Sequence, residues 1–124
     1  MRSASDIQQE IGQLLWTIFR QDANKAEFLV QSFPDVWGGE ISVRFYKDGE
    51  FLKYKTGETH PRDVWNQMRE LSHELQRTPP FDRQPFTHMR MELDEAGKMK
   101  VDFAYIPEWD SWPGLFMKGV SELT

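Results

Sequence analysis

The sequence predicts a single α+β domain in which helices pack against an antiparallel sheet made of two hairpins plus one strand. Two observations predict this class. Two helix-length segments carry apolar residues at helical spacing, and two other segments alternate apolar and polar residues on either side of a glycine-containing turn. The expected order of elements is α-β-β-β-α-β-β-α. With 124 residues, 39% of them hydrophobic, the whole chain, 1–124, is expected to form one domain with a substantial core.

The first helix is predicted over residues 6–20. Ser5 is the expected N-cap, because Gln8 follows it at the spacing of a capping box. A strand is then predicted over residues 28–33, ended by Pro34. The apolar stripe of the helix consists of Ile7, Ile11, Leu14, Leu15 and Ile18.

A first hairpin is predicted from strands at residues 41–46 and 51–55, with Asp48-Gly49 at the centre of a type I′ turn. The two-residue loop sets four cross-strand pairs, which are Phe45 with Leu52, Val43 with Tyr54, Tyr46 with Phe51, and Arg44 with Lys53. The last pair places like charges across the ladder, which is mildly destabilising. Either an acidic side chain of a neighbouring strand offsets these two cations, or they form an anion-facing patch.

The second helix is predicted to begin with Pro61 in its first turn and to end before Pro79-Pro80. Its apolar stripe consists of Val64, Met68, Leu71 and Leu75. A short last helix is predicted from Pro113, where it would pack its apolar positions on the domain.

The second hairpin lies within residues 86–105, where the alternation specifies the register. Keeping both faces in phase requires the loop Glu95-Ala96-Gly97, with Gly97 in the left-handed region that closes a G1 bulge. The apolar face then pairs Met91 with Val101. The outer face, which is expected to be solvated, pairs Glu92 with Lys100, Arg90 with Asp102, and His88 with Ala104.

Composition narrows the classes of function. The chain has no cysteine, begins without a secretory apolar run, and contains no stretch long enough to span a membrane, so a cytoplasmic location without membrane association is expected. The net charge is −5, and residues 91–124 hold seven acidic but only three basic side chains. This favours a basic partner over direct binding of nucleic acid, although such a charge also serves solubility.

Catalytic or metal-binding chemistry has no visible basis in the sequence. The three histidines, His60, His73 and His88, lie on three different predicted elements. The chain contains no glycine-rich phosphate loop, nucleophile elbow or HExxH motif. No enzymatic activity, metal or cofactor is therefore expected.

The segment Glu108-Trp109-Asp110-Ser111-Trp112 is a candidate for partner binding. Its tryptophans stand beside carboxylates that lie outside the predicted cross-strand pairs, a composition typical of an interface anchor with an electrostatic rim. The alternative is that the indoles seal the sheet edge or the core. The predicted partner-binding residues are Glu95, Glu108, Trp109, Asp110 and Trp112.

The two hairpins, VRFYKDGEFLKY and LDEAGKMKVDFAY, resemble those of the YezG-like immunity proteins. The resemblance spans residues 41–123 and is most specific at Gly97, Lys98, Val101, Asp102, Phe103 and Tyr105. It implies a cytoplasmic antitoxin that neutralises the C-terminal toxin domain, often a nuclease, of a polymorphic toxin used in contact-dependent inhibition between bacteria. It implies no catalytic residue, and a monomer forming a one-to-one complex is the expected state.

The chain departs from that family in the proline-bracketed EWDSWP, where a more acidic, tyrosine-containing segment is expected, so partner specificity does not transfer. A second resemblance is to small acidic secretion chaperones of the type III kind, which share the predicted order of elements. These chaperones are dimers that hold an extended effector segment on apolar grooves.

Overall fold

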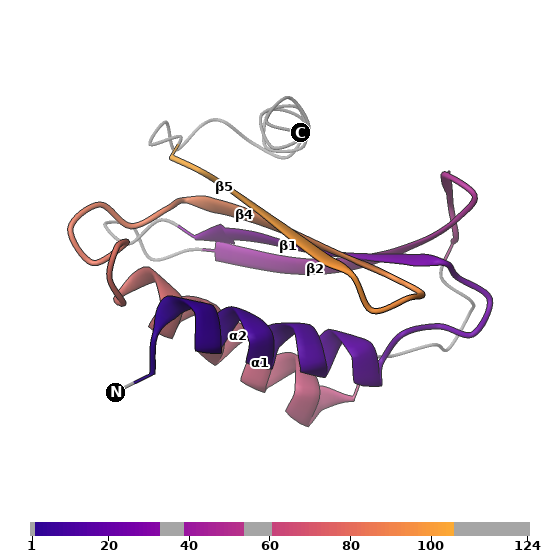
Figure 1. Cartoon of the computed structure of the whole chain (residues 1–124), viewed down its shortest axis with the longest axis horizontal. Helices are drawn as coiled ribbons and strands as arrows, with labels where there is room; N and C mark the ends of the chain where they lie inside the picture. The colour runs from indigo at the N-terminus through magenta and orange to yellow at the C-terminus, as the bar shows by residue number, and fades with distance from the viewer. Residues whose placement is uncertain (1, 33–38, 54–60, 106–124) are drawn as a thin grey trace.

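Two helices cover one face of a five-stranded antiparallel sheet, as the computed structural model of the chain shows (Figure 1). The structure describes residues 2–32, 39–53 and 61–105. The elements are α1 (Ala4–Thr17), β1 (Lys25–Ser32), β2 (Gly39–Lys47), β3 (Glu50–Phe51), α2 (Arg62–Gln76), β4 (His88–Asp94) and β5 (Met99–Ala104). This confirms the α+β class and the order of its first seven elements. The predicted last helix lies outside the described residues.

The first strand in the chain forms the centre of the sheet, whose order is β3-β2-β1-β4-β5. Each hairpin therefore flanks β1 on one side. The registers of the three ladders place Val43, Phe28, Met91 and Val101 in one row across the sheet, all on the face toward the helices. Phe28, Val43 and Met91 are fully buried. The core is thus a layer of side chains from β1, β2 and β4 against the apolar stripes of α1 and α2.

The first helix begins two residues earlier and ends three residues earlier than predicted. Ser3, not Ser5, is the N-cap: its hydroxyl accepts a hydrogen bond from the Asp6 backbone N–H, and the Asp6 carboxylate accepts one from the Ser3 N–H. Asp6 performs the reciprocal role that Gln8 was expected to fill. The predicted apolar stripe is confirmed, since Ile7 and its successors along it pack in the core.

Both predicted turns are confirmed by their backbone geometry. Asp48 and Gly49 have φ of 52° and 84°, as a type I′ turn requires. Gly97 has φ of 83°, and the Asp94 N–H donates to the Lys98 carbonyl at 3.0 Å, which closes the loop predicted at residues 95–97. The register of the second hairpin is also as predicted.

The other strands differ from prediction in their lengths. Strand β1 begins at Lys25, three residues earlier than expected, because it pairs along its full length with both neighbours. In the first hairpin only two ladder pairs form, the last being Tyr46 with Phe51. The predicted pair of Arg44 with Lys53 is therefore absent from the ladder of described residues, and Arg44 lies opposite Glu27 of β1 instead.

The second helix begins at Arg62, so Pro61 is its N-cap and not the first-turn residue that was predicted; the helix reaches its C-cap at Arg77, before Pro79-Pro80 as predicted. Near its end, the buried Gln76 side chain donates to the carbonyl oxygens of Ser32, at 3.2 Å, and Phe86, at 2.7 Å. These bonds satisfy backbone groups at the end of β1 and just before β4, so α2 fixes both strands at that edge of the core.

Candidate protein-interaction surface

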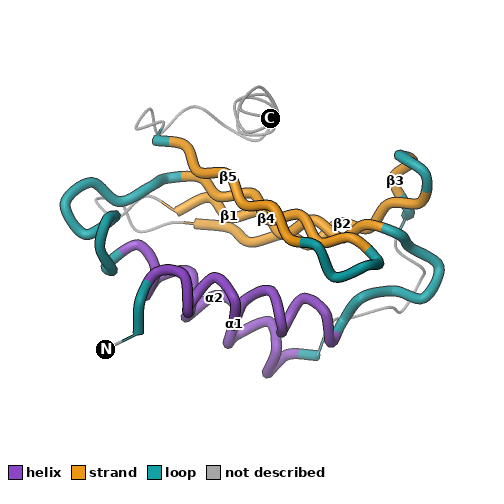
Figure 2. Tube along the Cα trace, viewed as in Figure 1, coloured by secondary structure: helices purple, strands orange, loops and turns teal. Residues whose placement is uncertain are grey.

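Both helices lie on one side of the sheet, as Figure 2 shows, and the opposite face carries polar side chains from several strands. Strand alternation and register arrange them in rows across the sheet. The rows are Phe51, Tyr46, Lys25 and Asp94; then Arg44, Glu27, Glu92 and Lys100; then Ser42, Leu29, Arg90 and Asp102; and finally Glu40, Gln31, His88 and Ala104. We call this side of the sheet the outer face.

The centre of the outer face holds a network of opposite charges. The Tyr46 hydroxyl donates to Glu27 Oε1 at 3.0 Å, while Arg90 Nε lies 3.6 Å from Glu27 Oε2. Arg90 Nη2 donates to Glu92 Oε1 at 2.6 Å, and Lys25 Nζ lies 3.5 Å from that same oxygen. Glu27 and Arg90 are buried, so the Glu27 carboxylate is stabilised by its partners rather than by water, whereas Glu92 is partly exposed. This part of the face is a fixed structural network.

Tyr46 is held in its neutral form by this environment. Burial raises the pKa of its hydroxyl, and the negative charge of Glu27 raises the pKa further, against the opposing effect of Arg44. A neutral hydroxyl is a hydrogen-bond donor, as the contact with Glu27 requires. Tyr46 therefore keeps one Glu27 oxygen occupied throughout the physiological pH range.

The prediction that the outer face is solvated is wrong over the central strands. His88, expected as a solvated position, is fully buried, and Leu29 on the same face is 1% exposed. Burial lowers the pKa of His88 to about 4, and its Nδ1 lies 2.6 Å from the Thr87 hydroxyl oxygen. Alternation in a hairpin shows which side chains share a face. It does not show whether that face is covered.

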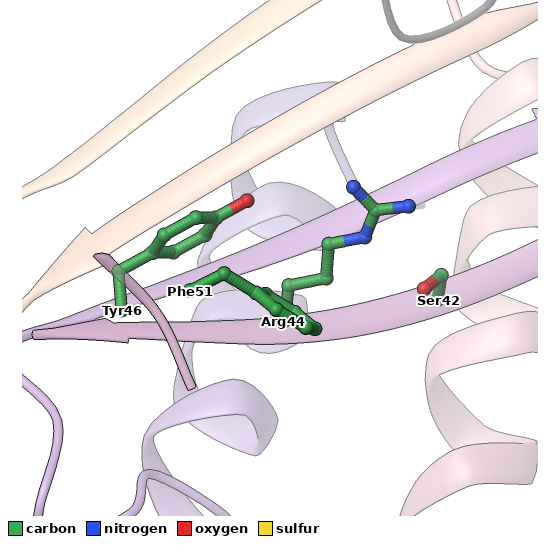
Figure 3. Close-up of a pocket in the computed structure, with 4 residues that line it drawn as sticks. All are labelled: Ser42, Arg44, Tyr46 and Phe51. Carbon is green, nitrogen blue, oxygen red and sulfur yellow. The ribbon is translucent and has the colours of Figure 1, made fainter. Parts of the chain in front are cut away.

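The edge of the outer face, in contrast, contains a pocket. A volume of about 400 Å³ is lined by Ser42, Arg44, Tyr46 and Phe51, and Figure 3 shows Arg44 and Tyr46 rising from β2 on the same side. The Arg44 guanidinium carbon is 6.0 Å from the centre of the Phe51 ring, within the range of a cation–π contact. Phe51 is 48% exposed. We call these four residues the edge pocket.

The sequence contained part of the signal for the edge pocket. The predicted pair of Tyr46 with Phe51 is confirmed, and strand alternation places Ser42, Arg44 and Tyr46 on one face. Of the two alternatives for Arg44 and Lys53, the structure shows the acidic neighbour for Arg44, because Glu27 of β1 lies opposite it, and the two cations do not form a ladder pair. The Lys53 carbonyl instead accepts a hydrogen bond from Arg20 at 3.2 Å.

Of the residues predicted to bind a partner, the structure describes Glu95. Its side chain is exposed in the turn between β4 and β5. Asn24 fixes this turn to the neighbouring one: the Asn24 carbonyl accepts from the Glu95 N–H at 3.1 Å, and its side chain exchanges two hydrogen bonds with Asp48, at 3.0 and 3.1 Å. Both hairpin turns are thus held together at one end of the sheet.

The remaining predicted partner-binding residues, Glu108, Trp109, Asp110 and Trp112, lie outside the described residues. Of the histidines, His73 is exposed on α2, His88 is buried, and His60 lies outside the described residues.

No group of three or more potential metal ligands comes together among residues 2–32, 39–53 and 61–105. In the same part of the chain, neither helix has the length and apolar character needed to cross a membrane.

Comparison with known proteins adds no assignment. No protein-family model matches this sequence, and no curated protein matches it significantly.

Proposed function

We propose that this protein is an immunity protein that binds and neutralises the C-terminal toxin domain of a polymorphic, contact-dependent toxin. The toxin domain is a basic protein, with a nuclease as the favoured class, and the complex forms one-to-one in the cytoplasm. The proposal has its source in the resemblance of the two hairpins to YezG-like immunity proteins. Binding, rather than catalysis, is the proposed activity.

The observation that carries the proposal is the rigid presentation of Glu95. Its turn is fixed internally by Gly97 and externally by the backbone bond to Asn24, while the side chain remains exposed. A carboxylate held on a rigid turn loses little conformational entropy when a partner binds. Asp48 and Glu50 are exposed on the turn that Asn24 joins to it, together with Lys47 and Lys98, so the acidic groups there act within a mixed surface.

The charge of the chain supports the same partner class. A nuclease grips phosphates through a basic cleft, and an acidic protein is attracted to such a cleft over distances of about a Debye length, ~8 Å at physiological salt. The net charge is −5, with the excess of acid concentrated in residues 91–124. Binding in the cleft blocks the entry of substrate.

A secretion chaperone of the type III kind is the second candidate. It is favoured by the order of elements α-β-β-β-α-β-β, which the described residues show. A stable dimer with open apolar grooves supports the chaperone, whereas a monomer that binds one toxin domain supports the immunity protein. Sedimentation of the purified chain, free and mixed with a toxin domain, distinguishes the two.

The direct test is rescue of cells that express the toxin domain encoded immediately upstream in the native genome. Rescue by the parent chain supports the proposal, and loss of protection is expected when both Trp109 and Trp112 are replaced by alanine. Reversing the charges of Glu95, Glu108 and Asp110 together is expected to slow association by about tenfold at low salt, because it removes electrostatic steering.

The control is a variant in which the charge of Glu70 is reversed. Glu70 is exposed on α2 and distant in the chain from the predicted interface. The association rate of this variant is expected to stay within twofold of the parent rate. A triple-reversal variant that associates as fast as the parent at low salt would contradict the electrostatic part of the proposal. A toxin domain that binds the chain without losing its toxicity would contradict neutralisation.

A further inference from the structure

Arg44 differs from two other cations of the outer face, Lys25 and Arg90. Lys25 and Arg90 both form ion pairs with carboxylates of β1 or β4. Within the described part of the chain, no ion pair links Arg44 to a carboxylate. Glu27 lies opposite it on β1, but the Glu27 oxygens face the Tyr46 hydroxyl and Arg90. The guanidinium group lies close enough to the Tyr46 hydroxyl to lower its pKa, and its other N–H groups keep the capacity to bind an anion.

The side chains around Arg44 indicate which kind of anion fits the edge pocket. The edge pocket offers the Ser42 hydroxyl two positions along the same strand and the exposed ring of Phe51 as an apolar wall. It has a volume of about 400 Å³ and is an open depression rather than an enclosed cavity, so it suits a single side chain. A carboxylate matches the planar fork of a guanidinium group, and a short aliphatic stem matches the ring.

We infer that the edge pocket binds an aspartate or glutamate side chain of a protein partner that crosses the sheet edge in an extended segment. The guanidinium of Arg44 pairs with the carboxylate, the Ser42 hydroxyl donates to it, and Phe51 packs on the stem. The pocket is open to solvent rather than enclosed, so a side chain of a passing segment can enter it without the partner chain ending there. Arginine, tyrosine and phenylalanine are also the residues enriched at protein interfaces.

A protein partner fits this surface better than a nucleic acid does. One arginine supplies a single phosphate contact, and the carboxylates of Glu27 and Glu92 lie in the adjoining network. The chain as a whole carries a net charge of −5, which repels a polyanion. The inference does not rest on the proposed immunity function, because it concerns residues other than those predicted to meet the toxin domain.

The test uses the full chain, labelled with ¹⁵N, and titration with the peptide acetyl-Ala-Glu-Ala-amide followed by NMR. Chemical-shift changes are expected at Ser42, Arg44 and Phe51, with the matched glutamine peptide binding about fivefold more weakly. In the Arg44→Gln variant the preference for the glutamate peptide is expected to disappear. The control Lys47→Gln removes the same charge from an exposed position of the same strand and is expected to retain the preference.

Four results would overturn the inference: equal affinity for the two peptides, loss of the preference in Lys47→Gln as well, a stronger response to acetyl-Ala-Gln-Ala with a free carboxyl terminus, or tighter binding of a short oligonucleotide at the same residues. Thermal melting of both variants is expected to match the parent, which separates lost binding from lost folding. A chain that binds the glutamate peptide but fails to protect cells from the toxin domain refutes the proposed function alone.

Discussion

The buried histidine on the outer face predicts a specific loss of stability in mild acid. His88 is fully buried, and burial lowers the pKa of its imidazole from 6.5 to about 4. The folded protein therefore holds the ring neutral between these two values, while the unfolded chain binds a proton. Stability is fully present above pH 6.5 and falls as the pH drops toward 4, because protonation favours the unfolded state.

The size of this loss of stability follows from the difference between the two pKa values of His88, 6.5 in the unfolded chain and about 4 in the folded protein. Each pH unit between the two pKa values reduces the free energy of unfolding by up to about 1.4 kcal/mol. From pH 7 to pH 5 the expected loss due to His88 is about 2 kcal/mol, and the total by pH 4 is about 3 kcal/mol. A loss of this size is a large share of the ~5–15 kcal/mol that stabilises a typical domain.

Urea denaturation at a series of pH values measures this effect. The parent is compared with His88→Gln, whose side chain cannot take up the proton, and with His73→Gln, which removes an exposed histidine of α2. The free energy of unfolding of His88→Gln is expected to fall by about 2 kcal/mol less than that of the parent between pH 7 and pH 5. His73→Gln is expected to follow the parent. If His88→Gln and the parent show the same slope, the buried neutral state of His88 is refuted.

Three further predictions concern the fold. Replacing Gly97 by valine is expected to destabilise the protein by about 1–2 kcal/mol, because its φ of 83° is strongly disfavoured for a β-branched residue; an unchanged melting temperature would contradict this. Asn24→Ala is expected to cost about 1–2 kcal/mol through its lost side-chain bonds to Asp48, and hydrogen exchange should accelerate at the Asp48 amide but not at Met91. Met91→Ala is expected to cost about 2–5 kcal/mol in urea denaturation because it opens a cavity in the core, and a loss below 1 kcal/mol would argue against its full burial.

The turns and the second hairpin illustrate what local sequence determines. Side chains alternate between the two faces of a strand, so the length of the loop decides which residues pair. Gly97 adopts the positive φ that the three-residue loop needs, and this loop places Met91 opposite Val101. The exposure of Glu95 follows from the same reasoning, since a turn residue points away from the ladder. The presence of the first helix also follows from local sequence. Its N-cap is Ser3 and not Ser5, because both serines offer a hydroxyl but Asp6 completes the capping box for Ser3.

The sequence by itself therefore determined the α+β class, the register of the second hairpin, the turn of the first hairpin and the apolar faces of both helices, because these depend on residues close together in the chain. The tertiary structure alone decided that β1 lies between the hairpins, that His88 is buried, and that the edge pocket opens beside β3. Alternation assigns a side chain to a face of its strand. Whether that face is covered depends on neighbours brought together from distant parts of the chain, and Glu27 meets Arg90 and Tyr46 only because β1 pairs with both β4 and β2.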